Sequence, residues 1–362
     1  MFYRVFHWNF LRLPLALMAS VALLASCATS HSPDTAQSSS PSDSTASSAS
    51  LPDPRTLTGL SVVESLGDPT PISGTFTPRL PASITDVQGN AVTVTDTSRI
   101  LPLDLTGNIS RTLIALGLTD SIVGRTVSST ETALEKLPVV TENGHSINVE
   151  AALALHPTLV LTDLSVGPVE AFDHMRASGI PVVVLDSKHS LSTVEASIQA
   201  IGDAVGMGEA AQALGKRTRA EVDKAQAQIA QWAPKNPLNI AFLYVRGTAG
   251  VFFILGSEEG TSSLIEGVGA KDIATANGIT STTPASAEAL LKVNPDVYFT
   301  MSGGLESTGG LDGLLSRPGV SDTSAGQKQR VIAIPDGMSL SFGPQTGEVL
   351  LAVARALYGV QE

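Results

Sequence analysis

Two segments of the chain, residues 150–162 and 288–300, carry the same pattern and constrain the fold more than any other feature. Each begins with Glu-Ala, has proline at its eighth position and ends in threonine. Each therefore predicts a short amphipathic helix that ends at the proline, followed by a buried strand. Matching α/β elements flank the first copy at residues 113–122 and 180–185, and the second copy at residues 264–273 and 330–335. The duplication predicts two Rossmann-like α/β lobes, each with a mostly parallel sheet.

A single long helix is predicted between the two copies. Residues 209–232 are rich in Ala, Gln, Glu, Lys and Arg and contain no proline, and these residue types favour a helix. Such a helix would span about 36 Å, at about 1.5 Å per residue. The expected domains are residues 1–26 (signal peptide), 27–55 (serine-rich tether), 56–190 (N-terminal lobe), 191–235 (connecting helical segment) and 236–362 (C-terminal lobe).

The N-terminus has the features of an export signal that ends in a lipidation site. Residues 1–26 contain two arginines, an apolar run and no acidic residue, which is the profile of a secretory signal. The only cysteine, Cys27, follows Leu-Ala-Ser, as in the bacterial lipobox. Residues 28–50 include ten serines and three threonines and predict a flexible tether. We expect a lipid on Cys27 to hold the protein at the outer face of the cytoplasmic membrane; an ordinary signal peptide and a single anchor helix are the alternatives.

The composition argues against several classes of function. The chain has 362 residues and a formal net charge of −12, which argues against a nucleic-acid partner because phosphate binding uses clustered Lys and Arg. No apolar stretch after the N-terminus is long enough to span a bilayer. The sequence has neither a Walker motif nor a nucleophile elbow followed by Asp and His. We therefore expect a protein that is not an enzyme.

The lipobox, the tether, the duplicated unit and the single connecting helix together resemble the substrate-binding lipoproteins of ABC importers for iron complexes, haem and cobalamin. Within that family the chain is most similar to the haem-binding HmuT-type proteins of actinobacteria. The residues that carry this likeness are Asn-Gly-His-Ser at 143–146 and Tyr-Val-Arg-Gly at 244–247. The resemblance implies a class III substrate-binding fold and a protein that captures ferric haem and delivers it to an importer. A ferric siderophore or cobalamin is the alternative cargo, and a secreted hydrolase or an adhesion protein would be a different class of function.

The resemblance also implies how haem is held. HmuT-type proteins bind the iron between a histidine of one lobe and a tyrosine of the other, with an arginine bonded to the tyrosine; these roles fall on His145, Tyr244 and Arg246. Phenolate and imidazole both suit the axial positions of ferric haem. Residues 240–246 predict a strand, which places Tyr244 and Arg246 on one face, and we expect the guanidinium to hydrogen-bond the phenolic oxygen. His189, in a predicted turn, is the alternative to His145.

Three carboxylates are candidates for contacts with the importer. In this family one glutamate of each lobe is understood to meet arginines of the permease, and the candidates for this role are Glu131, Glu135 and Glu266. The expected partners are therefore haem, the permease, haem-donating surface proteins and, through the lipid on Cys27, the membrane.

Overall fold

The computed structural model describes residues 51–142, 144–248 and 250–361. The predicted signal peptide, Cys27 and the tether up to residue 50 lie outside the described residues. Within residues 51–55, which we expected to end the tether, Pro54 is buried. The Arg55 guanidinium donates to the carbonyl oxygen of Asn236 at 2.6 Å. No helix of the described part is both long and apolar enough to cross a membrane.

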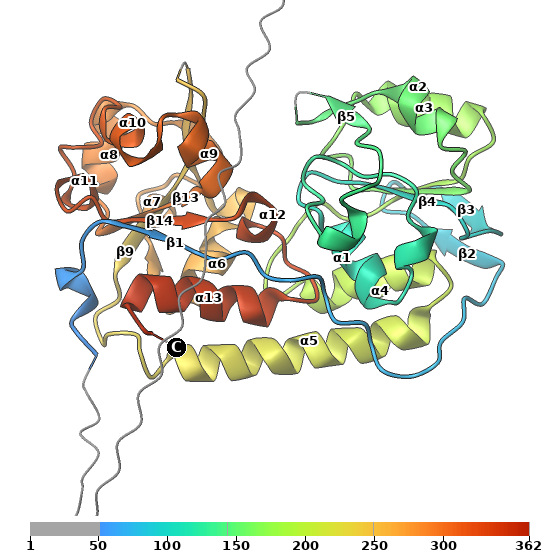
Figure 1. Cartoon of the computed structure of the whole chain (residues 1–362), viewed down its shortest axis with the longest axis horizontal. Helices are drawn as coiled ribbons and strands as arrows, with labels where there is room; N and C mark the ends of the chain where they lie inside the picture. The colour runs from blue at the N-terminus through green and yellow to red at the C-terminus, as the bar shows by residue number, and fades with distance from the viewer. Residues whose placement is uncertain (1–50, 143, 249, 362) are drawn as a thin grey trace, which may run out of the picture. The chain divides into compact units, whose positions relative to one another are not determined.

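The N-terminal lobe is built on a small parallel sheet in which β7 (Leu159–Thr162) lies between β4 (Ile100–Leu103) and β8 (Val182–Val184). Every residue of these strands is buried, as expected for a parallel sheet covered on both faces. The other elements of this lobe are α1 (Asn108–Ala115), α2 (Val149–Ala154), α3 (Val169–Ala177), α4 (Val194–Ala204), the β2–β3 hairpin (Ala82–Thr85 and Ala91–Val94) and the β5–β6 hairpin (Thr141–Glu142 and Ser146–Ile147) (Figure 1).

The C-terminal lobe contains a seven-stranded sheet with the order β1–β14–β13–β9–β10–β12, and β11 also pairs with β9. The strands are β1 (Leu60–Val62), β9 (Asn239–Arg246), β10 (Val251–Leu255), β11 (Lys271–Asp272), β12 (Thr283–Pro284), β13 (Val297–Met301) and β14 (Val331–Ile334). Only the pairs made by β10 are antiparallel. The helices are α6 (Thr261–Gly267), α7 (Ile273–Ala276), α8 (Ala287–Val293), α9 (Ser302–Ser307), α10 (Gly310–Leu315), α11 (Ser324–Gln327), α12 (Asp336–Ser339) and α13 (Thr346–Tyr358). The predicted α/β class with mostly parallel sheets is confirmed.

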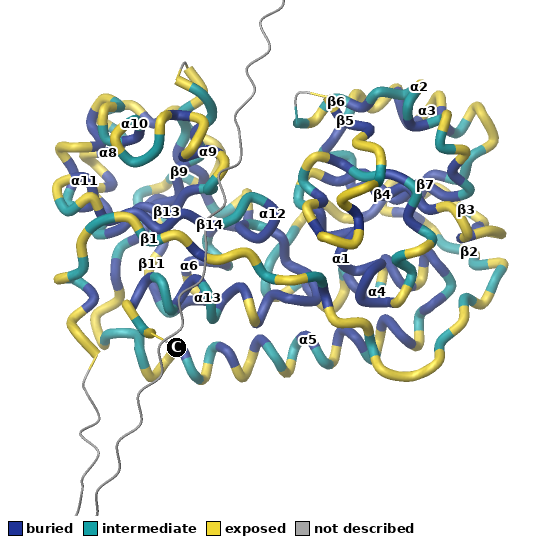
Figure 2. The backbone as a smooth tube through the Cα atoms, viewed as in Figure 1, coloured by how far each residue is buried: buried dark blue, intermediate teal, exposed yellow. Residues whose placement is uncertain are grey.

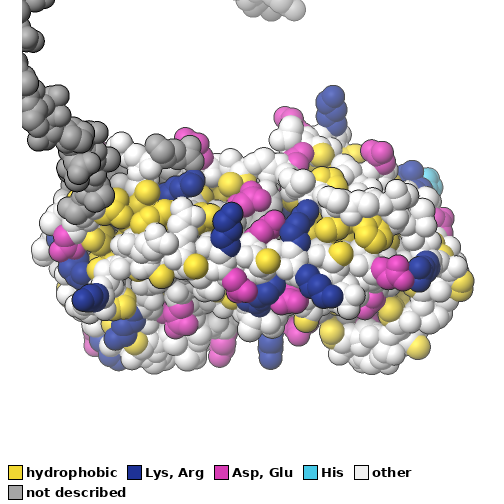
Figure 3. All heavy atoms as spheres, turned by 90° about the horizontal axis from the view of Figure 1, so that it is seen from below, with side chains coloured by type: hydrophobic (Ala, Val, Ile, Leu, Met, Phe, Trp, Pro, Cys, Tyr) yellow, Lys and Arg dark blue, Asp and Glu magenta, His cyan; other side chains and the backbone are white. Residues whose placement is uncertain are grey.

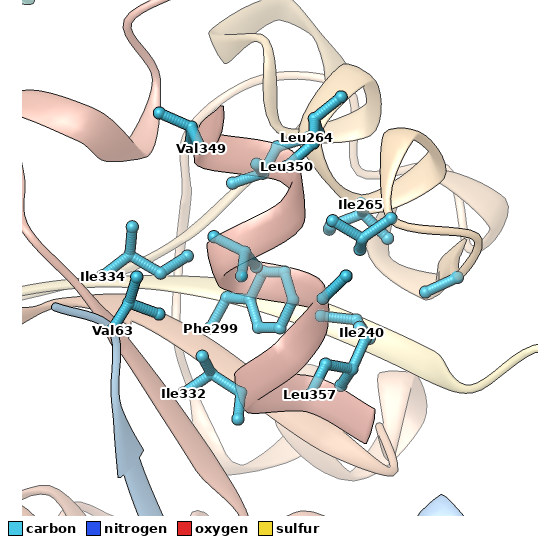
Figure 4. Close-up of a cluster of buried hydrophobic side chains, with 14 of the residues drawn as sticks. Val63, Ile240, Leu264, Ile265, Phe299, Ile332, Ile334, Val349, Leu350 and Leu357 are labelled. Carbon is cyan, nitrogen blue, oxygen red and sulfur yellow. The ribbon is translucent and has the colours of Figure 1, made fainter. Parts of the chain in front are cut away.

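Strand β1 belongs to the C-terminal sheet, although we expected residues 56–190 to form the N-terminal lobe. Leu60 pairs with Val331 and Val62 with Ala333 in parallel register. Val63, which follows the strand, is 3% exposed in the same core as Ile332 and Phe299 (Figure 4). The pairing joins β1 to β14, which are far apart in the sequence, so no local sequence pattern could predict it.

The two copies of the repeat form the same structure in the two sheets. Helix α2 precedes β7 and helix α8 precedes β13. Each helix is followed by a residue in the left-handed region, His156 with φ 47° and Asn294 with φ 37°, which ends the helix before its proline. The aligned residues thus have equivalent backbone roles, and the predicted duplication is confirmed.

The predicted connecting helix is α5 (Gly208–Ile229). It packs against α4 of the N-terminal lobe and α13 of the C-terminal lobe. Figure 2 shows buried and exposed residues alternating along it, and Figure 3, which views this side, shows mixed acidic and basic side chains. One ion pair of this helix joins Nε of Arg219 to Oε1 of Glu195 at 3.0 Å. A Cβ at Gly347 of α13 would lie 2.8 Å from the Glu221 carbonyl group, so α5 and α13 are in backbone-level contact.

Candidate functional site

Tyr244 and Arg246 lie on one face of β9, as the strand period predicts. Both are partly buried, whereas Val245 between them is 1% exposed. The pairing of β10 with β9 places Phe253 opposite Tyr244 and Val251 opposite Arg246. Because opposite residues of an antiparallel pair project to the same face, this face of the hairpin carries a phenol, a guanidinium and two apolar side chains.

The Arg246 guanidinium lies over the Tyr244 ring. Its central carbon is 5.1 Å from the ring centroid, within the range of a cation–π contact. Its Nη2 donates to the Asp336 carboxylate and, at 3.4 Å, to the Met301 sulfur. The guanidinium therefore bonds Asp336 in this structure, rather than the phenolic oxygen that we expected. Asp336 directly follows a predicted strand, and its place at the carboxyl end of a parallel strand is the signal that could have identified it.

Two consecutive glycines let the start of α9 approach Arg246. A Cβ at Gly304 would lie 2.4 Å from the Val245 carbonyl oxygen and 2.6 Å from Nη1 of Arg246. The backbone N–H of Gly303 donates to the other oxygen of Asp336 at 2.7 Å. Asp336 therefore contacts both the guanidinium and the first turn of α9.

His145 lies in the turn of the β5–β6 hairpin of the other lobe. Its backbone N–H donates to the Glu142 carbonyl oxygen at 3.2 Å, and its carbonyl oxygen accepts from the Gly167 N–H at 2.9 Å. The residue is exposed, and its imidazole has no hydrogen bond to another described residue. The β5–β6 hairpin and the end of β9 that carries Arg246 lie on the side of the molecule opposite α5 (Figure 1). The structure thus leaves the imidazole open to a ligand, and no described contact joins it to Tyr244 or Arg246.

His189, the alternative to His145, belongs to a buried polar cluster. Its Nε2 is 3.2 Å from Oδ2 of Asp163, and its side chain is only 11% exposed. Burial by itself lowers the pKa of His189, but the hydrogen bond and charge of Asp163, with the charges of Asp104 and Asp186, outweigh it and raise the pKa. Burial, followed by the charge of Asp163, raises the pKa of Asp104 to about 6. His189 therefore has a partner within the protein, whereas no described residue bonds the imidazole of His145.

The three predicted docking carboxylates do not share one environment. Glu131 is 6% exposed, and its Oε1 accepts from Nε of Arg111 at 2.6 Å, so it is not presented to a partner protein. Glu135 and Glu266 are exposed. The repeat contains a better matched pair that we overlooked: Glu150 and Glu288 are both exposed in the first turns of α2 and α8. Their gapless alignment was the signal available in the sequence.

Comparison with known proteins relates this chain to one family. A model of the periplasmic binding protein family matches residues 105–337. The crystal structure of the heme-binding protein HmuT has a TM-score of 0.83 and 53% identity, and the match covers 86% of this chain and all of HmuT. HmuT has also been solved with alanine replacing a histidine, a tyrosine and an arginine, one at a time.

Two further relatives extend the comparison. The apo form of the periplasmic heme-binding protein RhuT from Roseiflexus sp. RS-1 has a TM-score of 0.68 and 32% identity, over 73% of this chain and 99% of its own. The uncharacterized ABC transporter substrate-binding lipoprotein YvrC of Bacillus subtilis (strain 168) is 26% identical over 281 residues, which are 77% of this chain and 86% of that protein.

Proposed function

Since the chain belongs to the periplasmic binding protein family, we propose that it binds ferric haem outside the cytoplasm and delivers it to an ABC importer. The observation that carries this proposal is the tyrosine–arginine pair on one face of β9, with an exposed histidine on a hairpin of the other lobe. Proteins of this kind transport a substrate without converting it. The cargo is therefore held by reversible bonds, and no covalent step is needed.

We assign the axial bonds of the iron to Tyr244 and His145. The support comes from HmuT, in which the replaced tyrosine and arginine are two positions apart, and the replaced histidine precedes the tyrosine by the same interval that separates His145 from Tyr244. Phenolate donates charge to ferric iron, and neutral imidazole completes the axial pair. Arg246 places a positive charge beside the proposed ligand, because its guanidinium lies over the ring. Phe253 and Val251 supply apolar surface for the porphyrin on the same face.

A haem titration tests the cargo directly. Adding ferric haem to the purified chain should give a Soret band that saturates at a fixed ratio of haem to protein. Ferric siderophores and cobalamin, added separately, should neither bind nor compete with haem. If either one binds tightly and haem does not, the alternative cargo is correct and the assignment of Tyr244 to iron fails.

We also propose that the lipid on Cys27 anchors the protein, and that one glutamate of each lobe meets the permease. Membrane association follows from the predicted lipobox, and the related YvrC is itself a lipoprotein. Cys27→Ala should release the protein from the membrane fraction; an unchanged distribution would contradict the anchor. For docking we favour Glu150 and Glu288, because they occupy equivalent exposed positions in the two lobes, with Glu135 and Glu266 as the further exposed candidates.

A further inference from the structure

Two anionic groups can accept hydrogen bonds from Arg246. One is the Asp336 carboxylate, and the other is the phenolate that Tyr244 provides when it binds iron. In this structure Nη2 of Arg246 bonds Asp336, while the guanidinium carbon lies over the Tyr244 ring. The side chains of Arg246 and Asp336 are 33% and 35% exposed. The arginine is therefore not locked in a dry core, and its long side chain can exchange one partner for another.

Asp336, in contrast, is held in place. Its second oxygen accepts from the Gly303 N–H at 2.7 Å. The next residue, Gly337, abuts the N-terminal lobe, since a Cβ there would lie 3.0 Å from the Ser128 carbonyl oxygen and 3.1 Å from Nη2 of Arg111. Arg111 is itself fixed by its buried pair with Glu131. These contacts hold Asp336 independently of Arg246.

We propose that Asp336 is a positioning residue that competes with the Tyr244 phenolate for Arg246 and thereby weakens the retention of haem. This inference rests on the proposed ligation of iron by Tyr244. A carboxylate beside the guanidinium offsets part of its positive charge and takes its hydrogen bonds, so less of both is available to the phenolate. Both effects act in the same direction: the bond from Arg246 to Asp336 favours the haem-free state.

The test is the rate at which haem leaves the protein for an excess of apomyoglobin. Asp336→Asn removes the charge with little change in size and should slow the release of haem about 3- to 10-fold, a change typical of coupling between side chains in contact. Asp336→Glu keeps the charge and should restore a rate close to that of the wild type. Asp312→Asn, at an exposed position of α10 in the same lobe, is the matched control and should have no effect.

The decisive comparison is the double variant. If Asp336 acts through Arg246, Asp336→Asn combined with Arg246→Ala should release haem at the rate of Arg246→Ala alone. Asp336→Ala, which also removes the carboxylate, provides a second route if Asp336→Asn does not fold. Faster or unchanged release in every folded Asp336→Asn or Asp336→Ala variant would overturn the proposal. If Tyr244→Phe leaves the haem spectrum unchanged, the ligation itself is wrong, which is a separate outcome from a failure at Asp336.

Discussion

Phe253 lies directly opposite Tyr244 in the β9–β10 pair, so the proposed iron ligand and an aromatic ring project from the same face. Its neighbour Phe252 projects to the other face, where its ring lies 5.4 Å from the Arg317 guanidinium carbon. The two adjacent phenylalanines therefore face different sides of the hairpin. Phe253 lies on the side of the proposed haem site, and Phe252 packs against the C-terminal core.

This relationship predicts different effects of two alanine substitutions. Phe253→Ala should weaken haem binding about 3- to 10-fold, because it removes apolar area worth about 1 kcal/mol or more from the porphyrin contact. Phe252→Ala should instead lower the free energy of unfolding by about 1–3 kcal/mol and leave haem affinity close to that of the wild type. Haem titration and urea unfolding of both variants measure these effects, and equal losses of affinity would contradict the assignment of the two faces.

A substitution at Gly304 should disturb the arginine. The added Cβ of Gly304→Ala would meet the Val245 carbonyl oxygen at 2.4 Å, so α9 must shift, at a cost of about 1–3 kcal/mol. We expect lower stability together with weaker haem binding. Gly67→Ala is the control, because a Cβ at Gly67 would have no other atom within 4 Å, and it should change neither quantity. Normal haem binding in a folded Gly304→Ala variant would show that α9 does not position Arg246.

The buried cluster at Asp104 predicts a pH-dependent effect on stability. Burial, followed by the charge of Asp163, raises the pKa of Asp104 from 3.8 to about 6. As the pH falls, the folded protein therefore binds this proton at a higher pH than the unfolded chain does. Stability from this group is therefore lost as the pH rises from about 4 to about 6. The raised pKa of His189 acts in the same direction, because its stabilising contribution is full below 6.5 and is lost as the pH rises through its folded value.

Asp104→Asn removes the cost of the charged carboxylate. The amide oxygen of the asparagine can still accept from the Asn108 N–H, a bond of 2.7 Å in the wild type. The wild type loses stability from Asp104 as the pH rises, and the variant does not. The free energy of unfolding of the variant, relative to that of the wild type, should therefore increase by about 1–3 kcal/mol between pH 4.5 and pH 7.5. Urea unfolding at several pH values measures this difference, and a constant difference between the two proteins would mean that Asp104 does not titrate in this range.

Docking by the two repeat glutamates predicts a loss of uptake without a loss of binding. Glu150→Lys and Glu288→Lys should each reduce haem uptake by cells, because a lysine repels the arginines proposed on the permease. Haem titration of the purified variants should remain as in the wild type. Glu170→Lys, in the exposed first turn of α3, is the control and should transport normally. If only Glu135→Lys or Glu266→Lys reduces uptake, docking uses those residues instead.

The sequence predicted those features that depend on local pattern. The repeat copies, the helix α5 and the shared face of Tyr244 and Arg246 all follow from periodicity and from helix-ending residues, and the structure confirms them. The pairing of β1 with β14 could not be predicted in this way, since it joins segments far apart in the chain. The same holds for the bond between Arg246 and Asp336 and for the burial of Glu131 beside Arg111, because both depend on how separate loops pack.

The most direct test of the account is a set of haem spectra for three variants measured against the wild type. Tyr244→Phe should lose the charge-transfer bands of phenolate-bound ferric haem and should retain haem least well. His145→Ala should change the spectrum and leave a five-coordinate, tyrosine-bound haem. Arg246→Ala should keep the iron bound with an affinity about 10–100-fold lower. His174→Ala, at an exposed position of α3, should match the wild type; wild-type spectra and affinities for both Tyr244→Phe and His145→Ala would contradict the proposed haem site.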